Sequence, residues 1–192
     1  MKKKNNGGFT LIEILAVIII IGILLLITIP AVTNYISSSR RSAYADDIIA
    51  FLDNVKAEYD MKEYGSYVKE DEIMIVPLEF VTFEKGNNLS SPFSDYVFDK
   101  SYVVIIPERN GYSLYANVVD NSGIGVLFKL YNELNKEAIE DRITNNIKTW
   151  KSYITNNFTY NGNTYHMCDE RRIKKEEYPD ATKPAEVLVL CQ

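Results

Sequence analysis

The sequence is poor in the residues that bind metals and carry acid–base catalysis. Histidine occurs once, at His166, and cysteine twice, at Cys168 and Cys191. A single histidine excludes a multi-histidine metal site, and one His with one Cys falls short of the four ligands of a structural zinc. We therefore expect no metal, no cofactor and no enzymatic activity.

Positive charge is also scarce beyond the first residues. The chain carries 21 Lys and Arg against 26 Asp and Glu, which gives a formal net charge of −5. Binding of nucleic acid requires a basic patch or stripe, and the sequence offers none. The basic residues at 171–175 are flanked by acidic ones and predict a solvated loop. Nucleic acid is not an expected partner.

What the sequence does contain is one long apolar run. From Ile14 to Ile29 only Gly22 and Thr28 are not strongly apolar, and with its apolar neighbours the run reaches the length of about 20 residues that spans a bilayer. It is longer than the apolar region of a secretory signal peptide, and no small-residue cleavage site follows it. We expect a membrane-spanning helix.

The charges around the run predict its orientation. Lys2, Lys3 and Lys4 precede it, which favours an N-terminus in the cytoplasm and the bulk of the chain outside. Arg40 and Arg41 follow it and weaken this bias a little. The predicted protein therefore crosses the cytoplasmic membrane once, with its head outside the cell.

One carboxylate, Glu13, stands at the front of the apolar run. A charge there costs on the order of 2.5–3.5 kcal/mol on insertion scales, and such residues usually mark function. The alternative is an interfacial acid near the helix start that is favoured by the helix dipole.

The start of the chain resembles the type IV prepilin signature. The resemblance lies in the Lys-rich leader, Gly8, the motif Phe9-Thr10-Leu11-Ile12-Glu13 and the long apolar helix behind it. It covers about the first 35 residues closely. Beyond roughly residue 60 the resemblance is only architectural.

The resemblance implies specific roles for a few residues. Prepilin peptidase would cleave after Gly8, and the new amino group of Phe9 would be methylated. Glu13 would serve assembly by pairing with the Phe9 amine of a neighbouring subunit. Gly22 and Pro30 would form a soft segment that can loosen or bend in the fibre, although both are also tolerated breakers in membrane helices.

The implied function is that of a structural subunit of a type IV pilus on the cell surface. Expected partners are copies of itself and other pilins, the prepilin peptidase and methyltransferase, the assembly platform protein with its ATPase motor, and the membrane. A pseudopilin of a type II secretion or competence DNA-uptake system is the alternative within this class. A signal-anchored membrane enzyme or receptor is the alternative of another class.

The remaining sequence predicts an α+β fold in which a long N-terminal helix packs on a small antiparallel β-sheet head. Residues 1–8 form the leader, residues 9–35 the membrane and filament-core helix, and residues 36–192 the head, which includes the second half of the helix. Apolar residues recur every three or four positions in that second half and predict a buried stripe. The stripe comprises Tyr44, Ile48, Phe51, Leu52, Val55 and Tyr59. Tyr64-Gly65 is the expected helix end.

Turn residues separate several predicted strands in the head. Short strands are expected at 73–76 and 78–83, and a meander of three strands at 96–106, 112–119 and 125–130. Residues 134–153 carry Ile139, Ile143, Ile147 and Trp150 at helical spacing, a pattern that is compatible with a helix. Asn161-Gly162 predicts a hairpin, and residues 187–191 a buried strand.

The two cysteines pair if the head lies outside the cell, and otherwise they are two buried thiols. A disulfide between Cys168 and Cys191 would resemble the disulfide-closed C-terminal region of many pilins.

Overall fold

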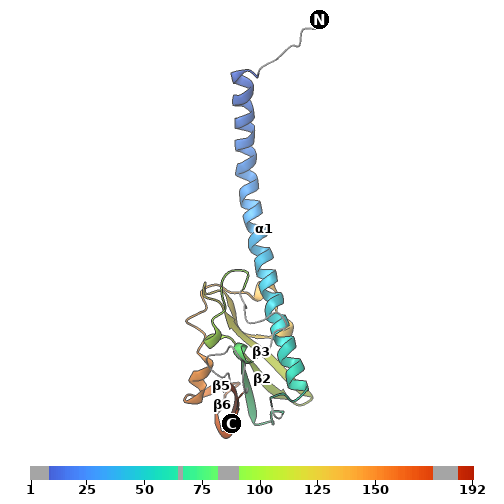
Figure 1. Cartoon of the computed structure of the whole chain (residues 1–192), viewed down its shortest axis with the longest axis vertical. Coiled ribbons are helices and arrows are strands. Elements are labelled where there is room, and N and C mark those ends of the chain that lie inside the picture. Colours follow the sequence, from blue (N-terminus) through green and yellow to red (C-terminus); the bar gives the residue numbers. More distant parts are fainter. Residues whose placement is uncertain (1–8, 65–66, 82–90, 175–185) are drawn as a thin grey trace. The chain divides into compact units, whose positions relative to one another are not determined.

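The computed structural model describes residues 9–64, 67–81, 91–174 and 186–192 of the chain. It divides into two units, Met1–Ser39 and Arg40–Gln192. The fold is α+β, as predicted, with one long N-terminal helix and an antiparallel β-sheet (Figure 1).

Helix α1 runs from Leu11 to Asp60 and contains Gly22 and Pro30 without interruption. Every residue from Leu11 to Val32 is exposed within the chain. The most apolar 18-residue window of α1 has a mean hydropathy of 3.2 and is entirely unburied. By length and composition the first part of this helix can cross a membrane.

The helix ends at Asp60, four residues before the expected Tyr64. Lys62 adopts the left-handed conformation (φ 62°), the Glu63 N–H donates to the Glu58 carbonyl at 2.9 Å, and the Lys62 N–H donates to the Tyr59 carbonyl at 3.0 Å. These bonds form a Schellman motif in which lysine occupies the position that glycine usually takes. The expected stop relied on Gly65, which lies outside the described residues.

Seven strands form one antiparallel sheet in the second unit, in the order β4-β3-β2-β1-β7-β6-β5. The strands are β1 (Glu72–Pro77), β2 (Tyr102–Glu108), β3 (Gly111–Val119), β4 (Gly125–Leu130), β5 (Phe158–Tyr160), β6 (Asn163–Lys174) and β7 (Glu186–Cys191). Strand β1 lies at the centre and every one of its residues is buried. The sheet is larger than the small one that the sequence predicts.

The second half of α1 covers one face of this sheet. The six residues of the predicted stripe are all buried, and they share a core with inward residues of the central strands, among them Met74, Val103 and Val189. The amphipathic pattern therefore predicted this packing correctly, because the 3.6-residue period places those side chains on one side of the helix.

A separate core fills the other face of the sheet. It combines Ile75, Val104 and Leu188 with Trp150, Tyr153 and Phe158. The sheet curls, and aromatic side chains from its two ends contact one another. The rings of Phe128 on β4 and Phe158 on β5 lie 6.0 Å apart, and the hydroxyls of Tyr115 and Tyr160 lie 3.0 Å apart.

The structure contradicts the prediction of a helix at residues 134–153. The segment is irregular and contains only two short 3₁₀ turns, η4 (Lys136–Ala138) and η5 (Trp150–Ile154). Its apolar residues are buried as expected, but Ile139 joins the core under α1, whereas Ile143, Ile147 and Trp150 join the core on the opposite face. A single helix could not contribute side chains to the cores on both faces of a sheet. The apparent helical spacing instead belongs to an irregular segment that passes round the edge of the sheet.

Two of the predicted strand positions also differ from the structure. Leu78–Phe80 is a 3₁₀ turn, and the strand expected at 96–106 begins only at Tyr102, after a second 3₁₀ turn at Phe98–Lys100. The turn-based predictions are confirmed. Glu108 pairs with Gly111 across the β2–β3 hairpin, and Asn161 and Gly162 both have positive φ between β5 and β6.

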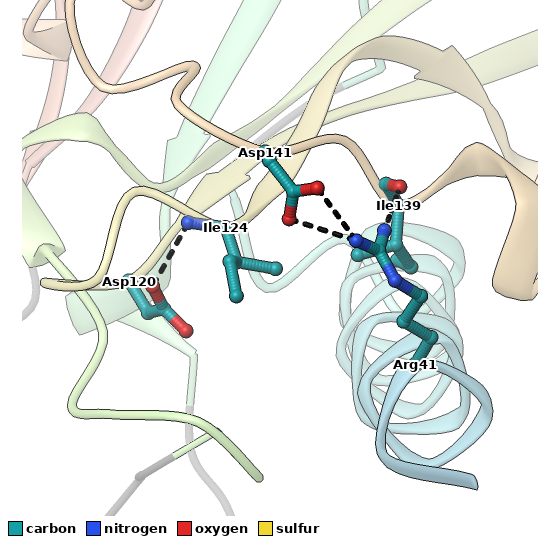
Figure 2. A network of polar contacts seen from close by, with 5 residues as sticks. All are labelled: Arg41, Asp120, Ile124, Ile139 and Asp141. Carbon is teal, nitrogen blue, oxygen red and sulfur yellow. Dashed lines mark hydrogen bonds and ion pairs between the residues drawn. The ribbon is translucent and has the colours of Figure 1, made fainter. Parts of the chain in front are cut away.

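Side-chain contacts of Arg41 join the start of the second unit to the irregular segment at residues 134–153. Its guanidinium donates to the Ile139 carbonyl at 2.5 Å and to both carboxylate oxygens of Asp141 at 2.8 and 2.7 Å (Figure 2). The neighbouring turn is held by Asp120, which is fully buried and accepts a bond from the Ile124 N–H at 3.1 Å. In the sequence Arg41 bears only on the orientation of the apolar run, and this contact was not predicted.

We expect Arg41→Ala to lower the free energy of unfolding by about 1 kcal/mol, because the bonds are charge-assisted but the Asp141 side chain is 58% exposed. Arg40→Ala is the matched control, since Arg40 is exposed and its removal should change stability by less than about 0.5 kcal/mol. Denaturant titration of both variants checks this. Equal stabilities would show that the Arg41 contacts contribute nothing.

Candidate functional site

The candidate site lies at the start of α1, where the chain enters the apolar helix. Phe9 lies two residues before the first residue of α1 and is 85% exposed, and Glu13 lies in the first turn. Gly8 and the three lysines before it lie outside the described residues.

Thr10 and Glu13 form a reciprocal capping box at this helix start. The Thr10 N–H and hydroxyl donate to Glu13 Oε2 at 2.8 and 2.9 Å, and the Glu13 N–H donates to Thr10 Oγ1 at 3.3 Å. Each side chain thus satisfies a donor that the first turn of a helix leaves free. This pair was not predicted from the sequence, although the spacing Thr-x-x-Glu before an apolar run is its known signal.

The capping box gives the Glu13 carboxylate polar partners within its own chain. Only Oε2 accepts these bonds, so Glu13 Oε1 takes no part in the capping box. An exposed carboxylate held in a fixed rotamer at the front of an apolar helix is suited to meet one cationic group from another molecule.

Gly22 and Pro30 both lie inside α1, which continues without a break through both positions. A Cβ built on Gly22 would meet nothing within 4 Å, so the space beside this residue is open. Pro30 lacks the N–H that would bond one turn back. Nearby, the Thr33 hydroxyl donates to the carbonyls of Ile29 and Pro30, both at 3.0 Å, which keeps that polar group satisfied in an apolar setting.

Cys168 and Cys191, on the neighbouring strands β6 and β7, are joined by a disulfide in the second unit. Their Cα atoms lie 5.3 Å apart, within the range of ordinary disulfides.

The comparisons with known proteins concern the first part of the chain. A family model described as the prokaryotic N-terminal methylation motif matches residues 3–29. These residues carry the type IV prepilin-like signal. No curated protein and no solved structure gives a significant match to the chain.

The motif, α1 and the cysteine pair fit one class of protein. The methylation motif, the membrane-capable helix and the disulfide-bonded cysteine pair are features of pilins and prepilins. The motif supports a pilin-like or pseudopilin substrate of prepilin peptidase and implies assembly into filaments. It also fits a membrane-anchored subunit of a surface filament.

Proposed function

We propose that this protein is a structural subunit of a type IV pilus. The observation that carries the proposal is the methylation motif at residues 3–29, together with a helix whose residues from Leu11 to Val32 are wholly exposed and, apart from Glu13, Gly22 and Thr28, apolar. An apolar surface of this extent requires a cover of lipid or protein. We infer that the membrane covers it before assembly and neighbouring helices cover it in the filament.

In this proposal residues 1–8 are a leader that prepilin peptidase removes after Gly8. Residues 9–35 then form the membrane and filament-core helix, and residues 36–192 the extracellular head. Lys2, Lys3 and Lys4 keep the leader in the cytoplasm, where the peptidase would act. Cleavage creates a new amino group on Phe9, which becomes methylated and keeps its positive charge.

Glu13 is proposed to exchange partners during assembly. In the isolated chain its carboxylate takes part in the capping box with Thr10. In the filament it would pair with the Phe9 amine of a neighbouring subunit, which relieves the cost of two separate charges in an apolar medium and fixes the axial register. Gly22 and Pro30 would allow α1 to adjust along its length as subunits pack. The platform protein, its ATPase motor and other pilins are the remaining proposed partners.

The exported protein is expected to begin at methylated Phe9. Intact-mass measurement of protein from the membrane fraction should show the loss of the first eight residues and the gain of one methyl group. Gly8→Val, which changes only the residue before the cleavage point, should retain the leader and serves as the control. A full-length mass for the wild-type protein would contradict the proposal and favour an uncleaved signal anchor.

A further inference from the structure

A groove of about 490 Å³ lies in the second unit, beside the last turns of α1. It is lined by Lys56 and Asp60 of α1, by residues 110–114 at the start of β3, and by Leu130, Tyr131 and Asn132 where β4 passes into the 3₁₀ turn η3 (Tyr131–Glu133). The volume falls in the usual range of small-molecule sites. None of these residues belongs to the assembly site at the start of α1.

Two tyrosines of the groove are held by carboxylates of α1. The Tyr112 hydroxyl donates to Asp60 Oδ1 at 2.6 Å, and the Tyr131 hydroxyl donates to Asp53 Oδ1 at 2.6 Å. The ring of Tyr59 packs edge-on against that of Tyr112, with 4.7 Å between centroids. The rings are therefore fixed before any ligand arrives, which lowers the entropic cost of binding to them.

The same contacts disfavour ionisation of both hydroxyls. Burial, followed by the hydrogen bond to Asp60, raises the pKa of Tyr112, and the hydrogen bond to Asp53 raises the pKa of Tyr131 above its ordinary value. Both phenols are therefore harder to ionise than a free tyrosine, and their hydroxyls remain donors to the two carboxylates of α1.

Three polar side chains of the groove remain available. Within the part of the chain that the structure describes, the Lys56 ammonium and the amides of Asn110 and Asn132 make no hydrogen bond or ion pair, and all three residues are exposed. Together they offer several donors and two amide acceptors around the aromatic rings.

The charges around the groove limit the kind of ligand. Asp60 lines it, Asp53 stands behind Tyr131, and the lining hydroxyl of Ser113 donates to Glu108. Lys56 is the one cation among the lining residues, and Arg109 and Lys129 are the sequence neighbours of the lining residues Asn110 and Leu130. With both signs close to the groove, no excess of positive charge favours a phosphorylated or carboxylated ligand, and an uncharged polyol needs none.

We propose that this groove binds a neutral saccharide. The apolar C–H faces of a pyranose ring would pack on Tyr112 and Tyr131, and its hydroxyls would bond Lys56 and the two asparagine amides. Such pockets combine aromatic walls with a few placed polar groups. This ligand site is independent of filament assembly through Glu13, so either could fail without the other.

Saturation-transfer NMR on the full-length protein tests the proposal. The protein is held in a zwitterionic detergent that contains no sugar, because glycoside detergents would compete. The neutral probes are lactose and di-N-acetylchitobiose at millimolar concentration, and sialyllactose is the charged counterpart. We expect binding of at least one neutral probe and weaker binding of sialyllactose than of lactose.

The double variant Lys56→Ala/Asn132→Ala should weaken binding of the neutral probe by about tenfold, through the loss of two exposed ligand contacts. Lys148→Ala/Asn145→Ala is the matched control, since it removes the same exposed residue types elsewhere in the same unit, and it should leave binding unchanged. No binding of either neutral probe, equal loss in both double variants, or preference for sialyllactose would each overturn the proposal.

Discussion

Glu13→Val should leave the protein in the membrane and reduce its incorporation into filaments at least about tenfold. Insertion should not suffer, because removal of a charge from the apolar segment lowers its transfer cost by about 2.5–3.5 kcal/mol. Assembly should suffer, because the Phe9 amine of the neighbouring subunit would be left in an apolar medium without its counter-charge. Immunoblots of sheared filaments and of membranes measure the two fractions separately.

Two further variants separate the ion pair from the capping box. Glu13→Gln removes the charge but retains a side chain that can accept from the Thr10 N–H, since glutamine also completes a capping box. Thr10→Val keeps the charge and removes the hydroxyl that bonds Glu13. If charge pairing drives assembly, Glu13→Gln should behave like Glu13→Val and Thr10→Val should assemble. Normal filaments from Glu13→Gln would refute the ion pair.

The parts of the fold that sequence predicted best are those governed by local rules. The spacing of Tyr44, Ile48, Leu52 and Val55 identified the buried side of α1 because a helix repeats every 3.6 residues. Asn161-Gly162 identified a hairpin because both residues accept positive φ at low cost. In each case the residues that carry the signal lie within a few positions of one another.

The errors arose where distant contacts decide the structure. Ile139 and Ile143 are separated by one apparent helical turn, yet they serve cores on opposite faces of the sheet. The Glu140 N–H and carbonyl both bond Gly125, at 2.8 and 3.0 Å, which ties this segment to the start of β4 and replaces the bonds of a helix. Nothing local to residues 134–153 reveals that pairing, because Gly125 lies on another element.

The order of the strands in the sheet also could not be predicted from short-range sequence patterns. The C-terminal strand β7 lies between β1 and β6, so the last residues of the chain complete the centre of the sheet. The run of apolar residues in β7 predicted a buried strand. It did not predict which strands pair with β7, since an apolar strand can pair with many others. At the start of α1, in contrast, the signals are local. Glu13 was recognised by its charge in an apolar run, whereas its Thr10 partner required attention to a short capping pattern.

The second large effect expected is on the stability of the head. Cys168 lies on β6 and Cys191 on β7, with a sequence separation of 23 residues between them. Cys191 pairs in register with Glu72 of β1 and with His166 of β6. The disulfide therefore closes a loop onto the strand that completes the central sheet.

We expect the double variant Cys168→Ser/Cys191→Ser to lose about 3–4 kcal/mol of unfolding free energy, because the unfolded chain regains the entropy of an open loop of this length. For a unit of this size the thermal midpoint should fall by about 10 °C. Circular dichroism of the full-length protein in detergent measures both quantities. Reduction of the wild-type protein should reproduce the loss, and the double variant should not respond to reductant. If thiol labelling proves complete reduction and the midpoint stays unchanged, then β7 is held by its strand pairing and buried apolar side chains alone.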